Sequence, residues 1–112
     1  MLKVSFENDG TELTLRIVGH AGQADIGHDI VCSACSILAY TVAQLVTTAD
    51  EVGDLKEPPE VKLESGNAII SCIPMEDTYS TILGIYMFAE VGYKLLAHNF
   101  PQFVELKSFG TV

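Results

Sequence analysis

The hydrophobic periodicity of the sequence changes twice from the alternation of a β-hairpin to the spacing of an amphipathic helix. In the first segment, apolar residues alternate with polar ones on both sides of the turn sequence at 8–11: Leu2, Val4, Phe6, Leu13, Leu15 and Ile17. This pattern predicts a hairpin with one buried face. A loop from Gly19 to His28 is expected to follow, because its three glycines leave the backbone free to bend.

A long helix is predicted from Asp29 to about Asp50. Its apolar residues recur at helical spacing and form one stripe, with further members that widen it: Val31, Ala34, Leu38, Val42 and Leu45, then Ile30, Ile37 and Tyr40. A stripe of this width predicts a helix that is well buried.

The second half of the chain repeats this order. Strands are expected at 61–64 and 68–72, and a second helix from about Glu76 to Asn99. That helix is apolar on two sides, and its only interior charges, Glu90 and Lys94, are predicted to form a narrow solvent edge as an i,i+4 pair. A helix of this kind needs two partners, the sheet and either the first helix or another subunit.

A last strand is expected from Phe103 to Ser108, so the element order is ββαββα followed by β. This order predicts an α+β layered domain with two long helices packed on a mixed or antiparallel sheet. The 112 residues suffice for one hydrophobic core, and we expect a single domain over 1–112.

The charge balance limits the partners. Six Lys and Arg stand against fifteen Asp and Glu, which gives a net charge of −9. Such a chain repels phosphates, so direct nucleic-acid binding is not expected. An acidic surface favours a basic partner, such as a ribosomal protein, although many soluble bacterial proteins are also acidic.

The start of the sequence and its cysteines indicate a cytoplasmic protein. No apolar signal core opens the chain, and the most apolar helical run, 37–46, is broken by Thr41 and Gln44, so we expect no membrane segment. Three cysteines are an odd number for a disulfide framework. They are better interpreted as core residues, ligands or nucleophiles, and Cys72 is expected in the core.

Cys32 is the candidate nucleophile. If Asp29 caps the helix, Cys32 lies in the first turn, where unpaired N–H groups and the helix dipole favour a thiolate. The same N–H groups could stabilise the oxyanion of a tetrahedral intermediate. The alternative is that Cys32 is a small buried apolar residue.

His20 is the candidate general base. It lies twelve positions before Cys32, and a loop with hinges at Gly19, Gly22 and Gly27 could fold it back over the helix start. A hydrogen bond that only stabilises the loop is the alternative for this histidine.

Two further residues could support the pair. Asp29 could orient His20 in addition to capping the helix, and Ser36, one turn beyond Cys32, could donate to the thiolate. Asp29 could instead be a cap alone, and Ser36 could bond the carbonyl of Cys32.

Cys32 and Cys35 also form a Cys-x-x-Cys pair at a helix start, the arrangement used in thiol-disulfide exchange. A thiol redox protein is therefore an alternative, although the βαβ context of that motif is missing. A structural zinc site commonly takes two such pairs, and the sequence has one. We expect no metal and no cofactor.

The stretch Gly19-His20-Ala21, followed by Gly27-His28-Asp29-Ile30-Val31-Cys32-Ser33-Ala34-Cys35-Ser36, resembles the signature of the ribosomal-processing cysteine proteases called Prp. The resemblance covers essentially the whole chain, with Cys35 as the chief departure. It implies removal of an N-terminal extension from large-subunit ribosomal protein number twenty-seven, with Cys32 as nucleophile, His20 as general base, a homodimer, and a mobile loop over 19–29. A non-catalytic module that binds a ribosomal protein or assembly factor is the remaining alternative.

Overall fold

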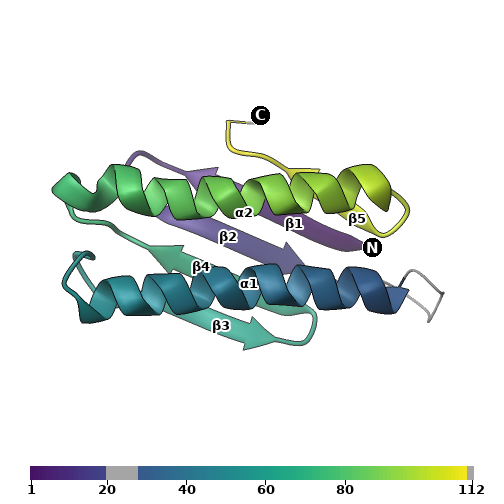
Figure 1. The fold of residues 1–112 in the computed structure, drawn as a ribbon, viewed down its shortest axis with the longest axis horizontal. Helices are drawn as coiled ribbons and strands as arrows, with labels where there is room; N and C mark the ends of the chain where they lie inside the picture. Colours follow the sequence, from purple (N-terminus) through teal and green to yellow (C-terminus); the bar gives the residue numbers. More distant parts are fainter. Residues whose placement is uncertain (20–27, 111–112) are drawn as a thin grey trace.

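The structure is a computed structural model of the chain that describes residues 1–19 and 28–110, with only the backbone of His28 and Asp29 described. The elements follow the predicted order, with a short 3-10 helix η1 before the second long helix (Figure 1). They are β1 (Leu2–Asn8), β2 (Leu13–Val18), α1 (His28–Glu51), β3 (Glu60–Glu64), β4 (Asn67–Cys72), η1 (Glu76–Thr78), α2 (Tyr79–Asn99) and β5 (Val104–Lys107).

The five strands form one mixed sheet in the order β3-β4-β2-β1-β5. Strand β5 pairs in parallel with β1, and the other neighbours are antiparallel. Both helices lie side by side across the same face of this sheet (Figure 1). The α+β fold with two long helices on a mixed sheet is therefore confirmed.

The core lies between the helices and the sheet face that alternate strand residues present to them. Its largest fully buried side chains come from three strands and both helices: Val4, Leu13, Leu15, Ile70, Val31, Val42, Val46, Ile82, Tyr86 and Tyr93. The predicted alternation in the first hairpin is confirmed, since its six apolar residues are all buried.

The core-facing stripe of α1 differs from the predicted one. Leu45 is 44% exposed, and Ala34 and Leu38 are only partly buried. Most residues turned to the core follow spacings of three and four, and Ala43 is buried beside them: Val31, Cys35, Ala39, Val42, Val46 and Ala49. Helix α1 is apolar on several sides, and the predicted stripe was only one of them. The side that packs on the core contains more small residues than the predicted one.

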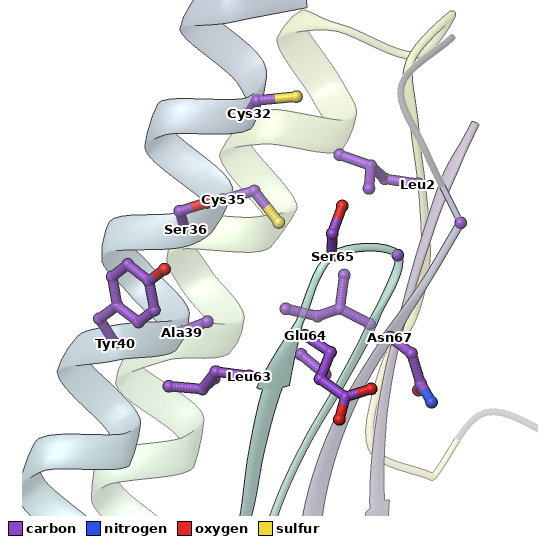
Figure 2. A pocket seen from close by; sticks show the side chains of 14 residues that line it. Leu2, Cys32, Cys35, Ser36, Ala39, Tyr40, Leu63, Glu64, Ser65 and Asn67 are labelled. Carbon is purple, nitrogen blue, oxygen red and sulfur yellow. The ribbon is translucent and has the colours of Figure 1, made fainter.

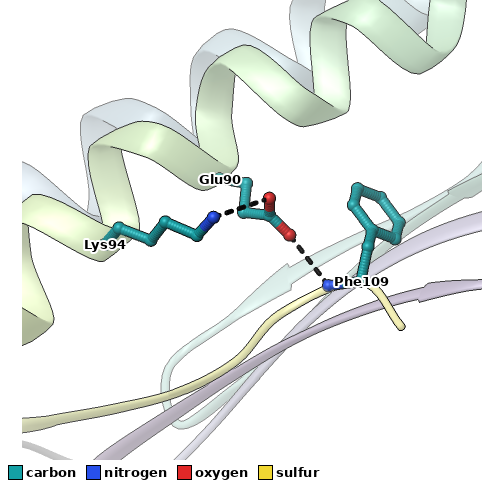
Figure 3. Close-up of polar contacts among 3 residues, drawn as sticks. All are labelled: Glu90, Lys94 and Phe109. Carbon is teal, nitrogen blue, oxygen red and sulfur yellow. Dashed lines mark hydrogen bonds and ion pairs between the residues drawn. The ribbon is translucent and has the colours of Figure 1, made fainter. Parts of the chain in front are cut away.

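Glu90 was expected at a solvent edge, and this prediction is wrong because the residue is 7% exposed. Its ion pair with Lys94 exists at 3.4 Å, and its other carboxylate oxygen accepts the backbone N–H of Phe109 at 2.8 Å (Figure 3). The ring of Phe109 in turn packs 5.2 Å from that of Phe6. The segment after β5 thus contacts α2 and covers Glu90, a long-range contact that helical spacing does not reveal.

The second apolar side of α2 remains exposed in the single chain. Met87, Val91 and Leu95 are each at least half exposed, and Phe88 is 82% exposed. Helix α1 packs along a different side of α2, where a Cβ on Gly92 would lie 2.8 Å from the side chain of Leu38. The expected second partner of α2 is therefore not supplied by α1 at these four residues.

Helix α1 extends well beyond both ends of the run 37–46 considered in the sequence. By length and composition alone, Ile30–Glu51 could cross a membrane. The core helix of a soluble protein meets the same criterion, and α1 places Val31, Val42 and Val46 fully inside the core. Packing on the sheet accounts for the apolar character of its inner side.

Candidate active site

Cys32 lies at the start of α1 and faces a cleft. It is the fifth residue of a helix that begins at His28, two residues earlier than the predicted cap at Asp29 implies. Helix ends are defined only to within one or two residues, and the side chain of Asp29 is not described, so its capping role stays a prediction. Cys32 is half-buried, and its sulfur points away from the helix axis into the cleft (Figure 2).

The cleft has a volume of about 740 Å³ and two walls. Helix α1 forms one wall, with Cys32 at its first turns and these residues further along: Cys35, Ser36, Ala39 and Tyr40. The β3–β4 hairpin forms the other wall, with these residues: Leu63, Glu64, Ser65, Gly66, Asn67 and Ala68. Leu2, Ile17 and Gly19 complete the lining. Figure 2 shows the helix wall and the hairpin wall facing each other.

The hairpin wall is the part of the site that the sequence did not reveal as functional. The strands on either side of 65–67 were predicted, but no residue type in the connection between them indicated a role. Its position beside α1 follows from the strand order, in which β4 pairs with β2 and carries β3 outward to the edge of the sheet. That order is a long-range property, and local periodicity does not determine it.

The end of β2 is tied to the same hairpin. The N–H of Gly19 donates to the carbonyl of Gly66 at 3.0 Å. Gly19 has φ 103°, a conformation that residues with a side chain rarely adopt, and a Cβ there would lie 2.5 Å from the carbonyl oxygen of Met1. The last described residue before His20 is therefore fixed at the border of the cleft that contains Cys32.

The remaining predicted site residues fall into two groups. Ser36 is exposed and lines the cleft one turn beyond Cys32 (Figure 2). His20, Gly22 and Gly27 lie outside the described residues, so the pairing of His20 with Cys32 stays a prediction.

Cys35 lines the inner part of the same cleft but is only 5% exposed. Burial raises the pKa of its thiol to about 11, an effect that Tyr93 partly offsets and nearby Cys32 adds to. The hydroxyl of Tyr93 donates to the backbone carbonyl of Cys35 at 2.9 Å and so links this turn of α1 to α2. At neutral pH, Cys35 is therefore a protonated thiol.

Cys72 is buried, as predicted, at the far end of β4. Burial raises the pKa of its thiol, and the hydroxyl of Tyr86 lies 3.6 Å from its sulfur. Tyr86 also donates to the carbonyl of Ile70 at 3.0 Å. Cys72 is thus a core residue outside the cleft.

A cysteine at the start of a helix, opening on a cleft between that helix and a β-hairpin, has the setting of a thiol nucleophile. Among the described residues, no group of three His, Cys, Asp or Glu side chains could hold a metal ion. The fold and the site thus define the class of small α+β enzymes that act through a cysteine.

Comparison with known proteins identifies the family within that class. The family model described as cysteine protease Prp matches residues 1–105. The chain belongs to this family and is a cysteine protease. No curated protein matches the sequence significantly.

Solved structures share the fold at low identity. SMU.848 from Streptococcus mutans has 23% identity and a TM-score of 0.68, over 97% of this chain and 94% of that one. The essential ribosomal processing protease Prp of Staphylococcus aureus, in complex with a substrate peptide, has 17% identity and a TM-score of 0.69. The match covers 96% of this chain and 99% of that one. Its complex with a covalently linked product peptide has 18% identity and a TM-score of 0.67, over the same shares.

Proposed function

We propose that this cysteine protease removes the N-terminal extension of large-subunit ribosomal protein number twenty-seven during ribosome maturation. The observation that carries the proposal is the position of Cys32 at one end of a cleft long enough for an extended peptide. From Cys32 to Tyr40 the α1 wall runs about 12 Å. That length corresponds to three or four extended residues at about 3.3–3.6 Å each.

Cys32 acts as the nucleophile. Its thiolate attacks the carbonyl carbon of the scissile peptide bond, and backbone N–H groups at the start of α1 stabilise the resulting oxyanion. Collapse of the tetrahedral intermediate breaks the C–N bond and leaves the N-terminal fragment attached to Cys32 as a thioester. Water then hydrolyses the thioester, which releases the fragment and regenerates the thiol.

His20 acts as the general base and then as the general acid. It takes the thiol proton from Cys32 and gives it to the departing amine, so the proton count balances over the cycle. Two observations support this role. The preceding residue, Gly19, borders the cleft and is held there by Gly66, and the helix start that contains Cys32 lines the same cleft. Asp29 orients the imidazole, and Ser36 donates to the sulfur.

The nature of the substrate is supported from two sides. The Staphylococcus aureus structural neighbour is an essential ribosomal processing protease, solved with a substrate peptide and with a covalently linked product peptide. The net charge of −9 favours a basic partner, which is the usual character of a protein that binds ribosomal RNA, and disfavours nucleic acid itself. No cofactor takes part in this mechanism.

The active form is a cytoplasmic homodimer. Helix α2 exposes an apolar patch, named here the α2 patch, formed by Met87, Phe88, Val91 and Leu95. Contiguous apolar surface of this kind marks sites of protein association. A second copy of the chain is the occupant, since a two-fold dimer buries the same patch of both copies in one interface.

The proposed function is tested with a synthetic peptide that covers the extension and the first mature residues of the ribosomal protein. The purified chain is expected to release two fragments whose masses identify a single cleavage site. Cys32→Ser, which differs by one atom, is expected to release none while keeping the same circular dichroism spectrum. An intact peptide after prolonged incubation with folded wild-type protein would overturn this choice of substrate.

A further inference from the structure

Cys32 and Cys35 present two sulfurs to one cleft, from successive turns of α1. Figure 2 shows both sulfur atoms on the cleft side of the helix. The chemistry of peptide hydrolysis uses Cys32 and leaves Cys35 without a role. We propose that the pair is a site of reversible oxidation, at which a hydroperoxide converts Cys32 and Cys35 to a disulfide that switches off the protease. The proposal rests on the nucleophilic role of Cys32 given above.

The helix geometry allows this bond. Residues three apart on an α-helix have Cα atoms about 5 Å apart, from a rise of about 1.5 Å per residue and a radius of about 2.3 Å. Disulfides span Cα separations of about 4.4–6.8 Å. Their Cβ atoms lie about 3.5–4.5 Å apart, closer than the usual neighbours on a helix surface, so the turn must tighten locally.

The backbone shift that brings the two Cβ atoms together occurs at Cys32 and not at Cys35. The backbone carbonyl of Cys35 is held by the hydroxyl of Tyr93 on α2, and the Cys35 side chain is buried. Cys32 is half-buried, and only four helical residues precede it. The four residues before Cys32 form the first turn, which lacks part of the hydrogen-bond ladder, so moving the helix up to Cys32 breaks fewer backbone bonds than moving a turn in the interior. A bond that imposes such a distortion is easily reduced, which makes the oxidation reversible.

The two thiols differ in exposure, and this difference determines which of them is oxidised first. Thiolates react with peroxides, and reaction also requires access. Cys35 is only 5% exposed and its thiol stays protonated, whereas Cys32 opens on the cleft. Cys32 is therefore oxidised first, and Cys35 is the resolving thiol.

The reaction balances in two steps. The Cys32 thiolate attacks the terminal oxygen of a hydroperoxide, forms an S–O bond, breaks the O–O bond and expels an alkoxide or hydroxide, which takes up a proton. The sulfur of Cys35 then displaces the hydroxyl of the Cys32 sulfenic acid, forms the S–S bond and releases water. The two thiols lose two electrons in total, and the hydroperoxide gains them. A dithiol reverses the change by thiol-disulfide exchange.

Cys72 does not compete for the sulfenic acid. It lies five residues along β4 from Asn67, which borders the cleft, a distance of about 17 Å along the strand. It is also packed in the core beneath Tyr86. The pairing of Cys32 with Cys35 is therefore specific among the three cysteines of the chain.

The consequence for the enzyme is protection as well as inhibition. A catalytic sulfenic acid without a nearby thiol proceeds with excess peroxide to sulfinic acid, which is irreversible except in a special case. Condensation with Cys35 stops the oxidation at the disulfide. Activity is then lost during oxidation and returns on reduction.

The experiment treats the full-length protein with a small excess of hydrogen peroxide and follows intact mass. Wild type is expected to lose two mass units, with fragment masses that place the disulfide between Cys32 and Cys35. Cys35→Ala and Cys35→Ser are expected to gain oxygen at Cys32, and Cys72→Ala is expected to behave as wild type. Two replacements at position 35 are used so that one with poor folding does not decide the outcome.

Recovery of peptide cleavage after dithiothreitol, relative to the untreated activity of each variant, is the second readout. Wild type should recover nearly all of its activity, and the position 35 variants less than a tenth. The proposal is overturned if the wild-type mass shows only added oxygen, if the disulfide involves Cys72, or if wild type and Cys35→Ala recover equally. Because the mass readout needs no substrate, disulfide formation in a chain that cuts no peptide would count against the proposed substrate and not against this site.

Discussion

The N–H of Gly19 donates a hydrogen bond to the carbonyl of Gly66, and the 3.0 Å contact ties the end of β2 to the β3–β4 turn. The two residues are far apart in the sequence, yet both line the cleft that contains Cys32. Since His20 follows Gly19 directly, this contact sets where the segment with the proposed base begins. The hairpin is therefore part of the machinery that positions the site, in addition to being a wall of the cleft.

Gly19→Ala tests this relationship. A methyl group there would face a strained φ of 103° and the carbonyl of Met1 at 2.5 Å. Positive φ alone costs a residue with a side chain about 1–3 kcal/mol, and the close approach adds to it. We expect a loss of at least about 2 kcal/mol in the free energy of unfolding measured in urea, with a fall in peptide cleavage.

Gly10→Ala is the matched control. Gly10 has a similar φ of 94°, but nothing lies within 4 Å of a Cβ built on it, and it is not part of the cleft. It should lose less stability than Gly19→Ala and keep its cleavage rate. Equal losses of stability and activity in the two variants would show that the approach to Met1 and the position beside the cleft do not matter.

The hairpin wall is expected to bind an apolar side chain of the substrate. Leu63 on β3 and Tyr40 on α1 face each other across the cleft (Figure 2). Leu63→Ser removes apolar surface worth about 1–2 kcal/mol on full burial by substrate, so kcat/KM should fall about tenfold. Val61→Ser is the control, because Val61 lies on the same strand with the same 39% exposure but does not line the cleft. If both variants lower kcat/KM equally, the wall has no role in specificity.

The α2 patch is expected to form the dimer interface. Phe88→Glu places a charge where an 82% exposed ring would be buried by the second copy, and desolvation of that charge opposes association. Sedimentation should show a dimer for wild type and a monomer for the variant. Val52→Glu, at an exposed position directly after the C-terminal end of α1, should stay dimeric. A monomeric wild type, or a variant that remains dimeric, would contradict this assignment.

The buried thiol of Cys35 predicts a loss of stability at alkaline pH. Its pKa rises from 9.0 to about 11 on folding because burial opposes the charged form. The unfolded chain therefore binds fewer protons between pH 9 and 11, so the free energy of unfolding falls as pH rises through that window. A pKa difference of this size changes the free energy of unfolding by about 2–3 kcal/mol.

Comparison with Cys35→Ala isolates this contribution, since Cys72 and the buried tyrosines titrate in both proteins. In urea titrations at pH 8 and pH 11, wild type should lose more stability than Cys35→Ala. Parallel losses would show that the Cys35 thiol ionises in the folded state as easily as in the unfolded one.

Local signals in the sequence account for most of the fold. The alternation in Leu2–Phe6 and the helical spacing over 29–50 and 76–99 placed the main elements within a few residues, because each pattern depends on neighbours along the chain. The errors arise from long-range contacts. Glu90 is buried because the segment after β5 covers it at Phe109, and the stripe of α1 differs because a helix apolar on several sides can pack in more than one rotation.

Only part of the candidate site could be predicted from local sequence. Cys32 was recognised from its place at a helix start, which depends on local sequence alone. Leu63, Ser65 and Tyr40 were not, because they meet only through the strand order that places β3 at the edge of the sheet beside α1. His20 was identified from spacing and resemblance, and its geometry lies outside the described residues.

The most direct test of the account is a search for the covalent intermediate. Wild-type protein is mixed with the extension peptide, quenched with acid within the first turnover and analysed by mass. The account predicts an adduct of the N-terminal fragment on Cys32 that disappears as product forms, no adduct in Cys32→Ser, and a much slower appearance in His20→Ala. Cleavage by Cys32→Ser at the wild-type rate, or an adduct on any other residue, would contradict it.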